Sequence, residues 1–154
     1  MNEWEFTGRV QSWINEIINK EPSLPFSEAR IEQSSSGSRK HRDLTIVNRD
    51  QRPVLTGEIK LPFRKDGSSP YQRTLVRDAR RKANEVNSPF FFTWNVNDCL
   101  LWQTDQPVQP GQPKSYRSWN VTEVHKESEL ELRVTQHELK KWLSGFLEDF
   151  GHIL

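Results

Sequence analysis

The chain has 154 residues, which is the size of one domain with its own hydrophobic core. Its residues are 33% hydrophobic and 28% charged with a net charge of +1, so any basic surface for nucleic acid must be local. The single cysteine, Cys99, excludes an internal disulfide and a zinc site built on several thiolates, and it favours a reducing compartment. No secretory signal and no apolar run approaching the roughly 20 residues of a membrane span is present. We therefore expect a cytoplasmic protein that does not bind membranes.

The N-terminal half predicts a helix, three strands and a second helix. Residues 3–20 carry apolar side chains at helical spacing, and "FSEARIEQ" alternates weakly as a strand does. The polar run "SSSGSRKHR" then leads to two strands, "DLTIV" and "VLTGEIKL", joined by the turn-rich "NRDQRP". After the loop "FRKDGSSP", residues 71–87 predict a helix with one apolar face, formed by Leu75, Ala79, Ala83 and Val86.

The C-terminal half predicts further strands and a last helix. "FFFTWNV" and "CLLWQT" are two strands joined at Asn97 and Asp98, with Trp94 and Trp102 expected in the core. "DQPVQPGQPKS" is a surface loop, and "YRSWNVTEV" resumes strand character. A capping box of Thr135 and Glu138 is expected to begin the last helix. The fold class is therefore α/β of the α+β kind, a mixed sheet flanked by helices.

Charges in the hairpin of residues 42–62 need an explanation. Strand side chains alternate between faces, so Asp43 lies on one face of the first strand, and Glu58 and Lys60 share a face of the second. If the turn is centred on Asp50 and Gln51, Asp43 lies opposite Glu58, with Cβ atoms about 5 Å apart. Two facing carboxylates require a compensating cation, of which Lys60 supplies a part and a divalent metal the rest. The alternative is an exposed hairpin with solvated charges.

"RDLTIV" followed by "GEIKL" resembles the signature of the PD-(D/E)xK nuclease superfamily, in which an Asp begins one strand and a Glu-x-Lys lies on the next. The matching residues are Asp43, Glu58 and Lys60, although Arg42 replaces the family's Pro. The resemblance implies a restriction-endonuclease-like core of order αβββαβ over roughly residues 3–95, followed here by C-terminal strands and a helix. "SSSGSRKHRD" also resembles the Ser/Gly loop of archaeal Holliday-junction resolvases. Whether Glu3 or Glu5 is the family's first-helix acid stays open.

The resemblance also implies a metal site. Mg²⁺, or Mn²⁺ in its place, prefers oxygen ligands, which Asp43, Glu58 and the Ile59 carbonyl can supply while phosphate oxygens complete the shell. Lys60 is then expected beside the attacking water and the scissile phosphate, where a cation stabilises the developing negative charge.

Two local basic groups are candidates for phosphate contacts. Arg39, Lys40 and Arg42 run directly into Asp43. On the second helix, four arginines share a polar flank opposite Leu75 and Ala79: Arg73, Arg77, Arg80 and Arg81. Of these, Arg77 and Arg81 are the candidates for DNA binding. The alternative for this helix is a solvated face partnered by Asp78 and Glu85.

The sequence thus predicts a magnesium-dependent endonuclease that hydrolyses DNA phosphodiester bonds in a restriction or phage-defence system. Residues 1–154 are expected to form a single nuclease domain, compatible with the N-terminal module of a larger protein. DNA is the expected partner, and further domains or subunits of a defence complex and a homodimer are compatible with the chain. Two alternatives stay open: a nucleic-acid-binding module in which catalysis has lapsed, and a structural module of a multisubunit assembly.

Overall fold

The computed structural model describes the backbone of residues 1–36, 39–106 and 115–154, and the side chains of these residues except 33–42. Three α-helices and six strands alternate along this part of the chain. In order they are α1 (Glu3–Lys20), β1 (Phe26–Ser36), β2 (Arg39–Asn48), β3 (Pro53–Ile59), α2 (Arg73–Glu85), β4 (Phe90–Trp94), β5 (Asp98–Gln103), β6 (Arg117–Asn120) and α3 (Arg133–Ile153). Short 3₁₀ helices, η1 (Lys65–Gly67) and η2 (Glu127–Glu131), precede α2 and α3.

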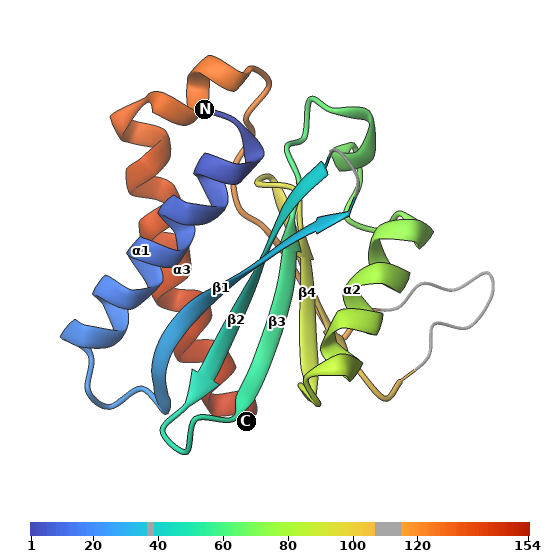
Figure 1. Ribbon diagram of the computed structural model, residues 1–154. Coiled ribbons are helices and arrows are strands. Elements are labelled where there is room, and N and C mark those ends of the chain that lie inside the picture. The colour runs from blue at the N-terminus through green and yellow to red at the C-terminus, as the bar shows by residue number, and fades with distance from the viewer. Residues whose placement is uncertain (37–38, 107–114) are drawn as a thin grey trace.

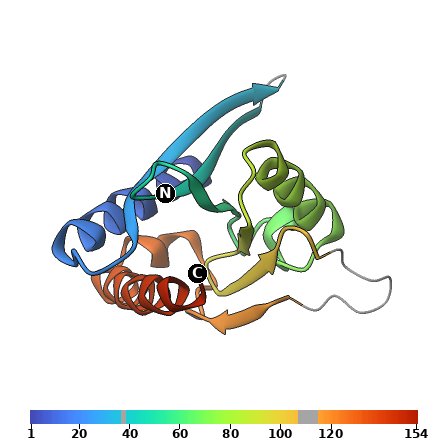
Figure 2. The ribbon, with the colours of Figure 1, turned by 90° about the horizontal axis from the view of Figure 1, so that it is seen from below.

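The six strands form one mixed sheet in the order β1-β2-β3-β4-β5-β6. β3 and β4 are parallel, and the other neighbouring pairs are antiparallel. Parallel neighbours need a crossover connection, and here η1 and α2 form it. Figures 1 and 2 show α1 and α3 on one face of the sheet and α2 on the other. The predicted α+β class, with its αβββαβ order followed by strands and a helix, is confirmed.

The larger apolar core lies between the sheet and the pair α1 and α3. Alternate residues of the central strands point into it, including Leu44, Ile46, Leu55 and Ile59, all at most 3% exposed. The helices contribute stripes such as Phe6, Val10 and Ile14 of α1 and Leu139, Leu143 and Phe146 of α3. This layer contains most of the buried apolar side chains of the described residues, whose removal from water stabilises the sheet.

The layer beneath α2 is smaller and more polar. Val76, Ala79 and Ala83 pack on Phe91, Leu100 and Trp102 of the sheet. Trp94 and Trp102 are buried, as predicted, and the Trp102 indole donates a hydrogen bond to Thr93 Oγ1 at 3.0 Å. Beside this cluster, the α2 face of β2 and β3 carries Thr45, Thr56 and Glu58, which are all buried. Polar side chains therefore lie under the edge of α2.

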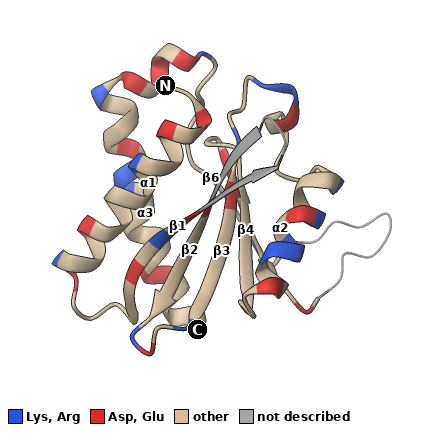
Figure 3. Cartoon of the chain, viewed as in Figure 1, with Lys and Arg blue, Asp and Glu red and all other residues tan. Residues whose placement is uncertain are grey.

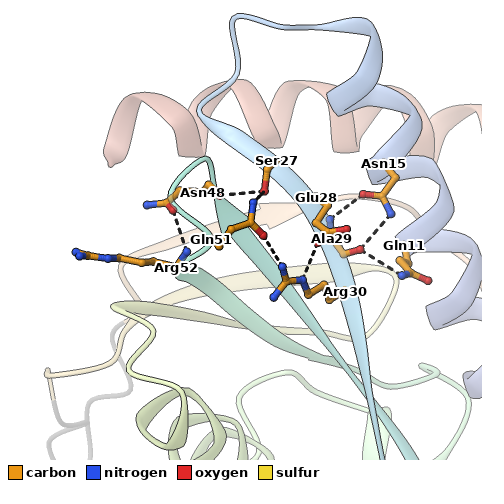
Figure 4. A network of polar contacts seen from close by, with 9 residues as sticks. All are labelled: Gln11, Asn15, Ser27, Glu28, Ala29, Arg30, Asn48, Gln51 and Arg52. Carbon is orange, nitrogen blue, oxygen red and sulfur yellow. Dashed lines mark hydrogen bonds and ion pairs between the residues drawn. The ribbon is translucent and has the colours of Figure 1, made fainter.

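The β2–β3 turn is held by side-chain hydrogen bonds (Figure 4). Asn48 Oδ1 accepts from the backbone N–H of Arg52 at 3.0 Å. It also accepts from the backbone N–H of Asp50 at 2.9 Å. These bonds let residue 51 adopt the left-handed conformation, with a φ of 63° at Gln51. Ser27 Oγ of β1 donates to the Asn48 carbonyl at 2.9 Å and thereby ties the turn to the neighbouring strand. The turn pairs Val47 with Pro53, and a register shift between Ile46 and Val47 then leads to the Ile46–Leu55 pair, so the turn and this bulge together set the register of the hairpin.

The edge strand β1 is attached to α1 by amide side chains (Figure 4). Asn15 Oδ1 accepts from the Ala29 N–H at 2.7 Å, and the Asn15 amide donates to the Ala29 carbonyl at 3.1 Å. Gln11 donates to the same carbonyl at 3.2 Å. These bonds satisfy backbone groups of an edge strand that would otherwise be open to pairing with another chain.

Two local predictions are corrected. The polar run after Gln33 was expected outside the strands, but β1 and β2 continue as a paired ribbon as far as the Ser36–Arg39 pair. The capping box of Thr135 and Glu138 is wrong, because α3 begins at Arg133 with Leu132 as its N-cap and Thr135 lies inside the helix. A side-chain cap is found at the start of η2 rather than of α3, where Glu129 Oε1 accepts from the N–H groups of His125 and Lys126 at 3.1 and 2.9 Å.

Among the described residues, no helix combines the length and the apolar character that crossing a lipid bilayer would require.

Candidate active site

The register of the β2–β3 hairpin brings Asp43 and Glu58 together. Leu44 pairs with Gly57, and Thr45 with Thr56. One further step along both strands places Asp43 opposite Glu58, as predicted. The assumed turn centre is corrected, because Val47 pairs with Pro53 around Asp50, and a bulge between Ile46 and Val47 shifts the register by one residue before the Ile46–Leu55 pair. The side chains of Asp43 and Glu58 are 14% and 10% exposed, so both carboxylates are largely shielded from water.

The cation between these carboxylates is Lys82, from the last full turn of α2. Its Nζ donates to Asp43 Oδ1 at 2.8 Å and also to Glu58 Oε1. Lys60 was expected to supply part of this positive charge. In the structure Lys82 supplies it instead. We call Asp43, Glu58 and Lys82 the Lys82 cluster.

Burial and charge act in opposite directions on Lys82. Burial alone disfavours its charged form and lowers its pKa. The hydrogen bonds to Asp43 and Glu58 and the negative charges of both act the other way and prevail, so the pKa of Lys82 is raised above its ordinary value. Lys82 is therefore charged at neutral pH, and its ammonium offsets one of the two negative charges.

Lys60 lies at the end of β3 in a second cluster. Its backbone N–H donates to the Trp94 carbonyl at 2.8 Å, so the pairing of β3 with β4 extends to this residue. Its Nζ lies 3.7 Å from Glu3 Oε2 at the start of α1 and 3.6 Å from Asp66 Oδ2 of η1. We call Lys60, Glu3 and Asp66 the Lys60 cluster. Of the two first-helix acids left open by the sequence, Glu3 is the one that contacts Lys60.

Two glycines shape the backbone around these clusters. A Cβ on Gly57, next to Glu58, would lie 2.1 Å from the Phe92 ring, so only glycine lets that ring pack against β3. A Cβ on Gly67 would lie 1.9 Å from the Leu61 carbonyl oxygen. The η1 loop can therefore fold back on Leu61 and carry Asp66 to Lys60 only because residue 67 has no side chain.

The remaining predicted metal ligand is the Ile59 carbonyl. Ile59 is the last residue of β3, its register partner is Trp94, and its side chain is buried in the larger core at 3% exposure. It lies between Glu58 and Lys60 in sequence and thus links the two clusters. The side chains of Arg39, Lys40 and Arg42, predicted to contact DNA, lie outside the described residues.

The arginines of α2 are not equivalent. Arg77 and Arg81 are exposed, and Arg81 pairs with Glu85 at 2.9 Å while Arg77 lies 3.9 Å from Asp78. Arg80 packs its guanidinium over the Phe91 ring, 5.2 Å from the centroid, and donates to the Gln106 carbonyl at 2.9 Å. Burial lowers the pKa of Arg80. Arg80 is therefore a packing residue, and Figure 3 shows charges of both signs along α2 rather than a purely basic face.

The described residues contain no group of three or more His, Cys, Asp or Glu side chains arranged to hold a metal ion. What the site offers is one pair of carboxylates on adjacent strands. A cage made entirely of such side chains is thereby excluded for this part of the chain.

Sequence reasoning missed Lys82 and Asp66. Lys82 follows Leu75 by seven residues and Ala79 by three, so it belongs to the apolar stripe of α2 that faces the sheet. A lysine inside such a stripe signals a buried anionic partner. Asp66 carries no comparable signal, because a loop residue has no periodicity.

The fold has a counterpart among solved structures. The type IIG restriction endonuclease BpuSI matches 90% of this chain with a TM-score of 0.51 and 15% sequence identity. The match covers 16% of the BpuSI chain, so this chain spans about a sixth of the length of that protein. No family model and no curated protein sequence matches this chain. The chain has a restriction-endonuclease-like fold, and at this identity the likeness extends to the fold alone.

Proposed function

We propose that this chain is a metal-dependent endonuclease domain of the PD-(D/E)xK kind that hydrolyses phosphodiester bonds in DNA. The observation that carries the proposal is the convergence of Asp43 and Glu58, from adjacent strands of a restriction-endonuclease-like sheet, on a single cation position. The structural neighbour is a restriction endonuclease, which favours DNA as the substrate and a restriction or defence system as the setting. Residues 1–154 would act as one nuclease domain within, or associated with, a larger defence assembly.

The donor set fits Mg²⁺, or Mn²⁺ in its place. Lys82 Nζ contacts one oxygen of each carboxylate, which supports the assignment of Asp43 Oδ1 and Glu58 Oε1 to one shared cation position. Mg²⁺ is commonly held by one or two carboxylates and keeps several waters, so it does not need the larger side-chain cage that the described residues lack. When bound, the ion supplies Lewis acidity and lowers the pKa of a coordinated water.

The residues of the chain have distinct roles in this proposal. Asp43 and Glu58 hold the ion, together with the Ile59 carbonyl. Lys60 orients the attacking water and stabilises the negative charge that develops on the phosphorane. Glu3 and Asp66 hold the Lys60 ammonium at the end of β3 at distances near 3.7 Å, long enough to be given up when a phosphate arrives.

Cleavage of supercoiled plasmid, with Mg²⁺ and with EDTA, tests the activity. The wild-type protein should nick the plasmid only with the metal. Asp43→Ala should abolish both nicking and the calorimetric signal of Mn²⁺ binding. Lys60→Ala should lower the cleavage rate by about 10²–10³-fold, the usual cost of one charge-stabilising donor, and keep metal binding.

Arg64→Ala is a suitable control for Lys60→Ala, because it removes an exposed cation from the neighbouring loop. The Arg64→Ala protein should cleave at the wild-type rate. A Lys60→Ala protein that cleaves like the wild type would disprove the catalytic role of Lys60. Metal binding that survives Asp43→Ala would disprove the ligand assignment.

DNA binding by α2 is a separate part of the proposal. With Arg80 packed on Phe91, the phosphate contacts of this helix fall to Arg77 and Arg81, while Arg39, Lys40 and Arg42 would act from β2. Arg77→Glu with Arg81→Glu should weaken DNA binding at least tenfold and reduce its dependence on salt. Arg133→Glu with Lys141→Glu, on exposed positions of α3, makes the same change in net charge and should have little effect. Equal effects of the two pairs would assign the α2 arginines to a solvated face.

A nucleic-acid-binding module without catalysis is the second candidate. It is favoured by the ion pairs of the two lysines. Lys82 occupies the cation position at Asp43 and Glu58, and Lys60 pairs with Glu3 and Asp66 instead of with Glu58. The plasmid experiment separates the two candidates, because a binding module should bind the plasmid but should not nick it at any metal concentration.

A further inference from the structure

The Lys82 ammonium lies at the position that the proposed metal needs. Asp43 Oδ1 and Glu58 Oε1 both accept hydrogen bonds from it, so the lone pairs directed at the shared position are in use. Metal–oxygen distances for Mg²⁺ are about 2.0–2.1 Å, which places an ion between the same two oxygens. A divalent ion there would also be repelled by the ammonium, since like charges separated by a few ångströms in a shielded site interact strongly.

The Lys82 side chain can be displaced from this position toward solvent. Its side chain is 21% exposed, so part of the lysine is in contact with solvent. Its neighbour Ala83 is fully buried and Ala79 nearly so, which holds the helix backbone on the sheet, whereas a lysine side chain has a flexible stem of four carbons. The ammonium can therefore leave without a movement of α2.

We propose that Lys82 is a resident counter-ion that competes with the divalent metal for Asp43 and Glu58, so that the metal binds only as Lys82 is displaced. The inference rests on the proposed function in one respect, the assignment of these two carboxylates as metal ligands. In the metal-free protein Lys82 holds the two carboxylates together in the geometry that the metal requires. The same contact weakens metal binding, because each binding event must break two charged hydrogen bonds.

Calorimetric titration with Mn²⁺ alone, in the absence of DNA, tests the competition. Lys82→Met removes the charge and keeps an unbranched chain, Lys82→Gln is a second neutral variant, and Lys82→Arg keeps the charge. The matched control is Arg81→Met, which removes one cation from the adjacent position of α2, where the side chain is 59% exposed and paired with Glu85. Asp43→Ala tests whether Asp43 is a ligand of the metal.

Competition predicts that Lys82→Met and Lys82→Gln bind Mn²⁺ at least tenfold more tightly than the wild type. Lys82→Arg should bind no more tightly than the wild type, and Arg81→Met should stay within about twofold, because an exposed charge is screened. In thermal unfolding, Mn²⁺ should raise the melting temperature of Lys82→Met by more than it raises that of the wild type.

Other results would overturn the inference in distinguishable ways. Equal or weaker Mn²⁺ binding in both neutral variants, with binding lost in Asp43→Ala, would keep the ligand assignment and show that Lys82 supports the ion rather than competing with it. Mn²⁺ binding that persists in Asp43→Ala, or is missing from every variant, would refute the ligand assignment and the competition with it.

Discussion

The Lys82 cluster and the Lys60 cluster have the same composition, one lysine between two carboxylates, but differ in geometry. In the Lys82 cluster the ammonium is within hydrogen-bond distance of both acids, and the three side chains are 10–21% exposed. In the Lys60 cluster the distances are 3.6 and 3.7 Å, and Asp66 is 57% exposed. The first arrangement fixes its partners, whereas the second leaves its lysine available for a new one. Similar sets of charges can thus differ in how closely the lysine contacts its partners and in how far they are shielded from water.

The largest expected difference concerns stability in the absence of metal. Lys82→Met leaves two shielded carboxylates facing each other, and removing one partner of a buried ion pair costs 3–5 kcal/mol. With partial exposure discounted, we expect a loss of about 2 kcal/mol in the free energy of unfolding. Lys60→Met should cost less than about 1 kcal/mol, because its pairs are longer and reach solvent. Urea unfolding in EDTA measures both, and equal losses would remove the distinction between the clusters.

A smaller effect is expected in the pairwise coupling energies. A double-mutant cycle of Asp43→Asn and Lys82→Met should give a coupling of about 1–2 kcal/mol, since the two side chains are in direct contact. The same cycle for Lys60→Met and Asp66→Asn should give about 0.5 kcal/mol or less. Both cycles use the free energy of unfolding from urea titrations. A coupling of Lys60 with Asp66 as large as that of Asp43 with Lys82 would contradict the looser geometry.

The smallest expected effect is the response to salt. Raising NaCl from about 0.05 to 1 M shortens the Debye length to roughly 3 Å, which screens exposed charges much more than shielded ones. The coupling of Lys60 with Asp66 should then fall to near zero, and that of Asp43 with Lys82 should keep more than about half of its low-salt value. Repeating the two cycles at both salt concentrations provides the measurement, and parallel losses would mean that the clusters are equally solvated.

The alternation of the hairpin strands could be predicted from the sequence, but the bulge between Ile46 and Val47, which restores the register that the assumed turn centre required, could not. The turn residues are adjacent in sequence, and Asn48 alone binds two of the backbone N–H groups within it. Alternation along β2 and β3 then decides which side chains share a face, and the register after the bulge places Asp43 opposite Glu58. The helices and the burial of Trp94 and Trp102 followed in the same way from periodicity within single elements.

The partners of the two lysines could not be predicted, because they depend on how separate elements pack. Lys60 was expected beside Glu58, two residues away on the same strand. Instead it meets one acid from α1 and one from η1, whose positions depend on the close approach of Gly67 to Leu61. Lys82 reaches Asp43 of β2 only because the crossover between β3 and β4 lays α2 over these two strands, next to β2. Neither placement is encoded in the local pattern of the hairpin.

The crossover also affects the order in which the site is completed during folding. Asp43 and Glu58 belong to one hairpin, which can form by local contacts, whereas Lys82 is 39 and 24 residues away from them along the chain. Contacts at such separations require the closure of long loops and form later than local ones. A newly formed hairpin therefore carries two facing negative charges until α2 docks. Docking and hairpin formation favour each other, and this mutual dependence increases the cooperativity of folding.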